Sequence, residues 1–169
     1  IISHCLELEP IEVLDRLDEN CSTDICNQAK SYAQQRITTR KPLAYILGEA
    51  WLMGVPFYSD ERSIIPRSFI AELIVDGTLE PWLPPGGRAL DLCCGNGSLA
   101  ILLALSCPDI EVSATDLSEP AIALAAKNLD RHQLSKRIEV YLGDLWEPLP
   151  EPNLENLLDL ILNLAFPFL

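Results

Sequence analysis

The residues whose types and spacing best suit chemistry are an acid with a glycine turn, Asp91 and Gly95-Asn96-Gly97, and a second acid, Asp116. Glycine lets the main chain adopt left-handed conformations and lets a ligand approach closely. The free N–H groups at the start of a following helix would face that ligand. A carboxylate about 20 residues after such a turn can accept hydrogen bonds from both ribose hydroxyls. The pattern therefore predicts a site for a ligand that contains a nucleoside.

Asp91 indicates the charge of that ligand. A carboxylate just before the turn would repel a pyrophosphate and attract a cation. S-adenosylmethionine carries a sulfonium and an ammonium group, so it fits this position better than NAD does. The turn alone is weakly specific, because Ala100 stands where the dinucleotide fingerprint has its third glycine. A plain turn that joins a strand to a helix would look similar.

The turn lies within an alternation of predicted strands and helices. Apolar runs and helical spacing predict strands at 88–93, 110–115, 137–142 and 157–162, and helices at 98–106 and 119–132. This order is typical of an α/β, Rossmann-like, doubly wound sheet of parallel strands. Ligands bind such sheets beyond the carboxyl ends of the strands, where the strand order switches. We expect the turn, Asp116 and the pair Asp144-Leu145 at that edge.

The chain is expected to have three parts. Residues 1–41 predict a small helical region, 42–66 a β-hairpin linker, and 67–169 the α/β core. Helical spacing favours helices within 10–18, 22–37 and 68–79. Aromatic and β-branched residues around Gly48 and Gly54 predict the hairpin within 43–58.

Composition narrows the class of partner. The formal net charge is −13, and 49% of the residues are hydrophobic. Such a composition is typical of a globular protein. The negative charge argues against a nucleic-acid backbone as the main partner and would attract a basic protein. Solubility alone is the competing interpretation of the charge.

Other features argue against a membrane span, a signal peptide and a metal site. No apolar run reaches the roughly 20 residues that a span needs. The first residues, Ile1-Ile2-Ser3-His4, lack the basic region of a signal peptide. The six cysteines form no C-x-x-C pair and there are two histidines, so no metal site is expected. Cys93 and Cys94 are expected as packed thiols in a reducing cytoplasm.

Several motifs in one order resemble a known family. They are Arg40-Lys-Pro-Leu-Ala-Tyr-Ile-Leu-Gly, Phe57-Tyr-Ser-Asp-Glu-Arg, Ile65-Pro-Arg-Ser-Phe-Ile-Ala-Glu-Leu-Ile74 and Asp91-Leu-Cys-Cys-Gly-Asn-Gly. This series resembles the protein glutamine N5-methyltransferases, which modify ribosomal proteins and release factors. The forms Pro-Arg-Ser and Asp-Leu-Cys resemble the PrmB type, whose substrate is a large-subunit ribosomal protein. The release-factor type (PrmC, or HemK) is the alternative.

The resemblance implies S-adenosylmethionine as the cofactor and a role for each matching residue. Cys93, Cys94, Gly95, Asn96 and Gly97 would line its methionine part. Asp116 would bind the ribose, and Asp144 and Leu145 would flank the adenine. An apolar contact by Leu145 would replace the aromatic stacking of many relatives. A loop carboxylate or helix cap is the alternative role for Asp144.

One departure concerns the acceptor site. The family's catalytic signature after the fourth strand is Asn-Pro-Pro-Tyr, in which the Asn side chain and a proline carbonyl orient the substrate amide. Here Asn163 is followed by Leu-Ala-Phe-Pro-Phe-Leu169, so no Pro-Pro-Tyr follows it. Asn163 also lies one residue earlier than the family's spacing after Asp159 would place the Asn. Asn163 is the catalytic candidate, and a polar residue at a strand end is the alternative.

The ends of the sequence raise a second alternative. Four strands are predicted where a methyltransferase sheet has about seven, and an apolar edge strand would be an aggregation hazard. We therefore expect residues beyond Leu162 and before Ile1 in the intact protein. A truncated, inactive relative that binds the cofactor without methyl transfer is the competing hypothesis. The target glutamine and the oligomeric state do not follow from the sequence.

Overall fold

The computed structural model describes residues 1–150 and, as one strand, 160–163. The chain divides into two compact units, Ile1–Glu49 and Ala50–Leu169. Within the described residues, no helix is both long and apolar enough to cross a bilayer.

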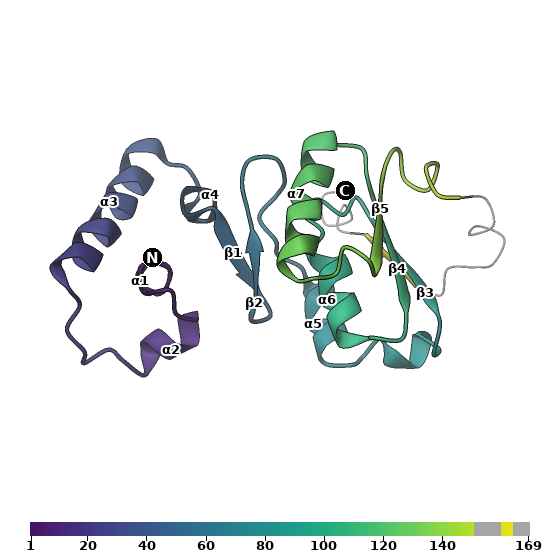
Figure 1. Ribbon diagram of the computed structural model, residues 1–169, viewed down its shortest axis with the longest axis horizontal. Helices are drawn as coiled ribbons and strands as arrows, with labels where there is room; N and C mark the ends of the chain where they lie inside the picture. Colours follow the sequence, from purple (N-terminus) through teal and green to yellow (C-terminus); the bar gives the residue numbers. More distant parts are fainter. Residues whose placement is uncertain (151–159, 164–169) are drawn as a thin grey trace. The chain divides into compact units, whose positions relative to one another are not determined.

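The first unit is helical (Figure 1). It contains α1 (Ile2–Leu6), α2 (Pro10–Leu14), α3 (Thr23–Thr39) and α4 (Leu43–Leu47). Ser22 caps α3, since its side chain accepts a hydrogen bond from the Ile25 N–H at 3.3 Å. The rings of His4 and Tyr32 meet edge to face at 5.5 Å, which joins α1 to α3.

Two expectations for this region need correction. The helix expected over 10–18 ends at Leu14, and the chain continues in turns. Residues 43–47, expected within the hairpin, form α4 instead. Pro42 precedes that helix, and Gly48 ends it with a left-handed φ of 71°. These two end signals override the β preference of the aromatic residues around them.

The hairpin itself is confirmed. It consists of β1 (Glu49–Leu52) and β2 (Val55–Tyr58), which form a two-stranded sheet. Met53 and Gly54 turn the chain with φ values of 51° and 78°. Two consecutive left-handed residues are the geometry that tight hairpins require.

The core sheet has the predicted α/β, Rossmann-like arrangement. Its strands are β3 (Arg88–Leu92), β4 (Glu111–Asp116), β5 (Ile138–Leu142) and β6 (Leu160–Asn163), in the order β5-β4-β3-β6. All three pairings are parallel. The chain moves outward from β3 through β4 to β5 and then returns to the other side of β3. The strand order therefore switches between β3 and β6, where such sheets bind ligands.

Three helices pack on one side of this sheet, α6 and α7 against its strands and α5 against α6 (Figure 1). They are α5 (Phe69–Val75), α6 (Ser98–Ser106) and α7 (Glu119–Arg131). Ser68 and Ser118 cap α5 and α7 through their side-chain oxygens. The helix expected over 68–79 ends at Val75, and the short 3₁₀ helix η1 (Glu80–Trp82) follows.

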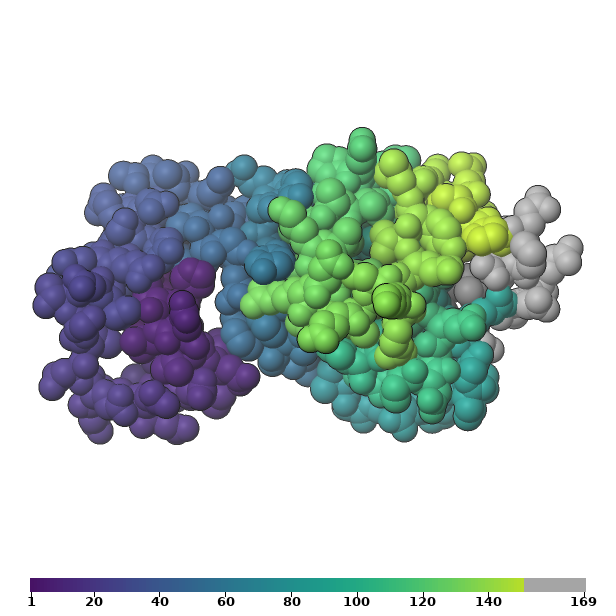
Figure 2. Space-filling model, viewed as in Figure 1, coloured from purple at the N-terminus to yellow at the C-terminus, as the bar shows by residue number. Residues whose placement is uncertain are grey.

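Helix α6 forms the centre of the core. Its residues from Ser98 to Ala104 are all buried, as expected for a helix that is apolar all round. Side chains fill the spaces between the ribbons of this unit (Figure 2). A smaller cluster of Leu90, Leu92 and Leu149 lies apart from the main core, with Tyr141 packed against it.

Candidate active site

The predicted residues meet at the carboxyl edge of the sheet. In the parallel register Leu92 of β3 lies beside Thr115 of β4 on one side and Asn163 of β6 on the other. The Gly143 N–H donates to the Asp116 carbonyl at 3.0 Å. The glycine turn, Asp116 and Asp144 thus lie at the edge that the sequence predicted, and Asn163 ends β6 at the same edge.

The turn after β3 is built largely from left-handed residues. Cys93, Gly95 and Gly97 have φ values of 56°, 57° and 76°. This conformation is unfavourable for Cys93, which has a Cβ, and such residues gather at binding sites. A Cβ on Gly95 would lie 2.6 Å from the Ser63 hydroxyl, so a larger residue there would displace the Ser63 side chain.

Asp116 is held by main-chain donors. Its Oδ2 accepts from the Gly95 N–H at 2.8 Å, and its Oδ1 accepts from the Ser118 N–H at 2.9 Å. Each carboxylate oxygen has capacity for a further hydrogen bond. Asp116 is therefore fixed against the glycine turn and can still accept bonds from a pair of hydroxyls.

Asp91 is fully buried beneath the turn. Its Oδ2 accepts from the Ala100 N–H at 3.1 Å, so it serves the first turn of α6, where Gly97 offers no capping side chain. Its Oδ1 has no partner among the described residues. Burial raises the pKa of Asp91 to about 7, and the charge of Asp116 adds to the rise while the Ala100 bond opposes it. A cationic group would satisfy Oδ1 and favour the charged form.

A third carboxylate contributes to the negative field. Burial raises the pKa of the Cys93 thiol, and Asp116, Asp91 and Asp144 all raise it further. All three carboxylates therefore act electrostatically on Cys93. The arrangement suits a cationic ligand and disfavours a phosphate. Within residues 1–150 and 160–163, no cluster of His, Cys, Asp and Glu could hold a metal.

Two of the predicted residues face inward. The Cys94 thiol lies in the hydrophobic core, where burial raises its pKa. The Asn96 amide is also buried, and its Nδ2 donates to the Tyr58 carbonyl at 3.3 Å. For these two residues the main chain is therefore the part that can meet a ligand.

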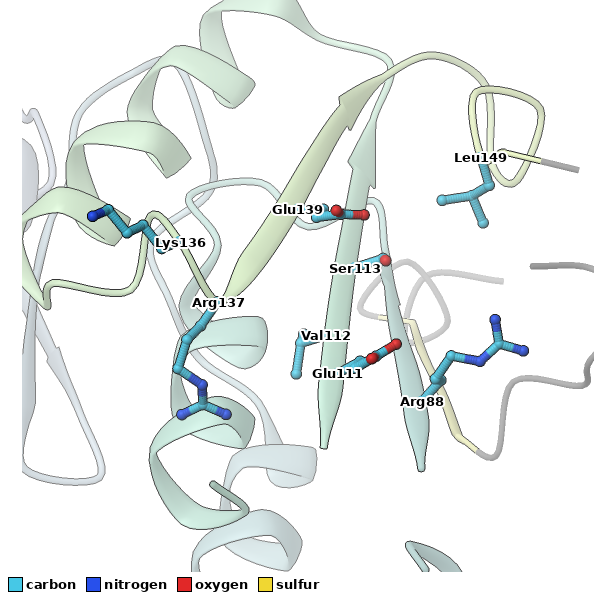
Figure 3. Close-up of a pocket in the computed structure, with 8 residues that line it drawn as sticks. All are labelled: Arg88, Glu111, Val112, Ser113, Lys136, Arg137, Glu139 and Leu149. Atoms are coloured by element: carbon cyan, nitrogen blue, oxygen red, sulfur yellow. The ribbon is translucent and has the colours of Figure 1, made fainter. Parts of the chain in front are cut away.

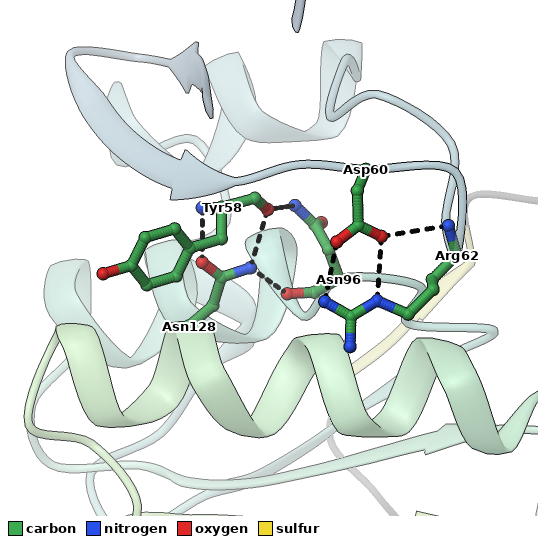
Figure 4. A network of polar contacts seen from close by, with 5 residues as sticks. All are labelled: Tyr58, Asp60, Arg62, Asn96 and Asn128. Carbon is green, nitrogen blue, oxygen red and sulfur yellow. Dashed lines mark hydrogen bonds and ion pairs between the residues drawn. The ribbon is translucent and has the colours of Figure 1, made fainter. Parts of the chain in front are cut away.

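Asn128 is a residue that the sequence analysis missed. It lies on α7, it is fully buried, and it bonds to both Asn96 and Tyr58 (Figure 4). A signal for it was present in the sequence, because Asn128 falls at helical spacing among apolar residues. The buried positions of α7 are 121, 124, 125, 128 and 129. An asparagine on such an apolar stripe marks a specific hydrogen-bond partner.

A strap of residues 59–63, which follows β2, lies beside the turn. Within it Arg62 makes a bidentate ion pair with Asp60, at 2.8 and 2.6 Å (Figure 4). The pair keeps the pKa of Asp60 below its usual range. Asp60, Glu61 and Arg62, together with Ser118 and Pro120 of the α7 start, line an open hollow of about 550 Å³. Ser118 also donates to Asp116, so this hollow adjoins the predicted ribose acid.

The loop after β5 carries Leu145 and Trp146. Leu145 is left-handed with a φ of 46°, which is unusual for a branched side chain. Both side chains are exposed, Leu145 by 36% and Trp146 by 49%. An aromatic ring is thus available one residue after the position where the resemblance led us to expect an apolar contact.

A second hollow begins at the opposite, amino ends of the strands and extends along the sheet to Ser113, Glu139 and Leu149 (Figure 3). Its volume is about 250 Å³, and its lining includes Arg88, Glu111, Lys136 and Glu139. Both charge signs are present there. None of the predicted site residues lines this hollow.

Comparisons with known proteins identify the family of the chain. The methyltransferase small domain family matches residues 72–163. A Burkholderia pseudomallei protein named ribosomal protein uL3 glutamine methyltransferase is 44% identical over 155 residues, covering 89% of this chain and 50% of that protein. The Bordetella pertussis protein of the same name is 40% identical over 153 residues, covering 89% and 51%.

The chain spans about half the length of these curated relatives. Among solved structures, an RNA methyltransferase from Salinibacter ruber in complex with S-adenosyl-L-homocysteine is similar, with 23% identity and a TM-score of 0.41. That match covers 49% of this chain and 52% of the other.

Proposed function

The chain belongs to the methyltransferase small domain family, and from that premise we propose that its protein methylates a glutamine side chain of ribosomal protein uL3 with S-adenosylmethionine. The observation that carries the cofactor is the pair of carboxylates held at the turn, at the switch in strand order: Asp116 accepts from the Gly95 N–H, and Asp91 keeps one buried oxygen without a partner among the described residues. The relatives that share 40–44% identity and are named for this reaction support the substrate.

The residues present fit this cofactor. Asp116 would accept hydrogen bonds from the ribose hydroxyls, because its oxygens are already aimed by Gly95 and Ser118. The unpartnered oxygen of Asp91 would draw the positively charged methionine part toward the turn. The main chain of 93–97 would line that part, with Asp144 and Leu145 beside the adenine.

The chain's own residues would hold and orient the acceptor. The cofactor supplies a methyl group activated by a positively charged sulfur. Asn163 lies beside Leu92 in the parallel register, at the edge that carries the glycine turn. An asparagine amide oxygen there can accept a hydrogen bond from the substrate amide and orient its nitrogen, which lowers the entropic part of the barrier. The residues after Asn163, where the family has Pro-Pro-Tyr, lie outside the described residues.

Charge supports a basic protein as substrate. The net charge of −13 would attract a ribosomal protein and speed its encounter with the enzyme. Ribosomal proteins occur in the cytoplasm, so we propose that the reaction takes place there. A direct preference for nucleic acid is not part of this proposal, because its backbone is also negative.

The test is methyl transfer by the full-length protein. It is incubated with S-adenosylmethionine and either isolated uL3 or a release factor, and the products are digested and examined for a methylated glutamine by mass spectrometry. Transfer to uL3 is expected. Transfer to the release factor alone would show that the substrate is wrong. Cofactor binding without transfer to either would favour the inactive cofactor-binding relative.

A further inference from the structure

The last turns of helix α7 bind the end of strand β2. The Asn128 Oδ1 accepts from the Tyr58 N–H at 2.7 Å, and its Nδ2 donates to the Tyr58 carbonyl at 3.2 Å (Figure 4). The Arg131 guanidinium lies 4.7 Å from the centre of the Tyr58 ring. His132 adds a 2.8 Å contact from Nε2 to the Pro56 carbonyl. The end of the hairpin is thus fixed to α7.

Asn128 also reaches the cofactor turn. Its Nδ2 donates to the Asn96 carbonyl at 3.0 Å, and Asn96 in turn donates to the Tyr58 carbonyl. The turn itself is packed on α7, since a Cβ on Gly97 would lie 3.2 Å from the Ala125 Cβ. One buried amide therefore bonds to two segments, 58 and 96, that are far apart in the sequence.

The strap begins at the residue that Asn128 holds. Tyr58 is followed directly by residues 59–63, and Ser63 at the far end lies against Gly95. The middle of the strap lines the hollow next to Asp116. Ser59 at its start is buried, and its hydroxyl oxygen has no partner among the described residues. The strap therefore lines a hollow that shares Ser118 with the hydrogen bonds of Asp116.

We propose that Asn128 is a positioning residue for the cofactor site, because it fixes Tyr58 to Asn96 and so holds the strap 59–63 beside the glycine turn. This inference rests on the proposed use of S-adenosylmethionine. Asn128 acts through the strap and the turn and does not itself touch the cofactor. Asparagine is needed because the site requires one acceptor and two donors on a single short side chain, which its amide group supplies.

The inference is tested by calorimetric titration of the full-length protein with S-adenosylmethionine. Asn128→Ala is expected to raise the Kd about tenfold or more, because the strap and the turn lose the amide that joins them. A tenfold change in Kd corresponds to about 1.4 kcal/mol. The rate at saturating cofactor is expected to change less than about threefold, because the acceptor side is untouched. A Kd within twofold of the wild-type value would overturn the proposal.

Leu124→Ala is the matched control. Leu124 lies on the same helix and is buried with 1% exposure, and it has no part in the polar network. This variant is expected to lower the melting temperature at least as much as Asn128→Ala does and to leave the Kd unchanged where both are folded. If the two variants weakened cofactor binding equally, Asn128 would have only a packing role.

Hydrogen exchange on the wild-type protein gives a second test that does not depend on a variant folding. Adding S-adenosylmethionine is expected to slow exchange at the amides of 58 and 60–63 together with those of the glycine turn. Slower exchange at the turn alone would contradict the role of the strap. If the wild-type protein does not bind S-adenosylmethionine at all, the proposed function itself fails, which is a separate outcome.

Discussion

The two edges of the parallel sheet differ in a way that locates the site. At the carboxyl edge, Asp91 is buried and one of its oxygens is unpartnered, and Thr115 is buried with an unpartnered hydroxyl. The backbone there is left-handed at Cys93, which is unfavourable for a residue with a Cβ. These features cost stability, so a ligand that satisfies them is the simplest reason for their presence.

The amino edge shows the opposite pattern. Its hollow is lined by Arg88 and Lys136 together with Glu111 and Glu139, so positive and negative charges are interspersed. Arg137, which also lines this hollow, has a structural role, since it donates to the carbonyls of Ala104, Pro108 and Ile110. A hollow alone therefore says less about function than buried groups that lack partners.

The largest effect on stability is expected from a substitution of Asp91 at the carboxyl edge. In the folded protein burial raises its pKa from 3.8 to about 7. The folded state therefore binds more protons between these values, and the contribution of Asp91 to stability falls as pH rises from about 4 to 7. Asp91→Asn removes this loss and keeps an acceptor for Ala100.

The expected gain for Asp91→Asn is up to about 4 kcal/mol at pH 8, from about 1.4 kcal/mol per pKa unit. Urea unfolding of both proteins from pH 4 to pH 8 measures it, and the gain should shrink toward pH 4. The same variant should bind S-adenosylmethionine more weakly. A stability difference that does not vary with pH would show that Asp91 is not held in this protonation equilibrium.

Asp116→Ala is expected to have the next largest effect. It removes the acceptor proposed for the ribose and leaves the Gly95 and Ser118 N–H groups without their partner. Cofactor binding should weaken by about 1–3 kcal/mol. Calorimetric titration measures this change, and unaltered affinity would refute the assignment of Asp116.

A substitution near the amino edge should separate stability from binding. Arg137→Met keeps most of the side-chain stem and removes the hydrogen bonds to the end of α6 and the loop after it. The free energy of unfolding should fall by about 1–2 kcal/mol. The Kd for S-adenosylmethionine should not change. A higher Kd would contradict the assignment of stability alone to this edge.

The smallest effect is expected at two other charged residues of the same hollow. Glu111→Gln and Lys136→Met alter its lining without removing a described bond of the core. Each should change stability by less than about 0.5 kcal/mol, as is usual for surface substitutions. Each should also leave methyl transfer unchanged. Loss of methyl transfer in either variant would show that the amino edge takes part in the reaction and would contradict the placement of the site at the carboxyl edge.

The sequence was informative where local rules and periodicity act. The strand, glycine turn and helix around Gly95, and the acid that ends the next strand, follow from apolar runs and glycine chemistry. Helix α4 was missed because its end signals, Pro42 and Gly48, outweighed β-forming side chains. Left-handed Cys93 could not be foreseen, since nothing in its side chain favours that conformation.

Asn128 shows a different limit of sequence reasoning. Its position on the buried stripe of α7 was visible, but its partner Tyr58 lies 70 residues earlier in the chain. Only the three-dimensional packing of the hairpin on α7 gives that asparagine its meaning. The roles of Asn163, Asp144 and Leu145 remain predictions that the edge placement supports.

The central claim is that the carboxyl edge holds S-adenosylmethionine, and amide chemical shifts test it most directly. Isotope-labelled full-length protein is titrated with S-adenosylmethionine. We expect the largest shifts at Gly95, Gly97 and Asp116, with little change at Glu111 and Lys136. Shifts concentrated at Glu111 and Lys136, or no shifts at either edge, would contradict it.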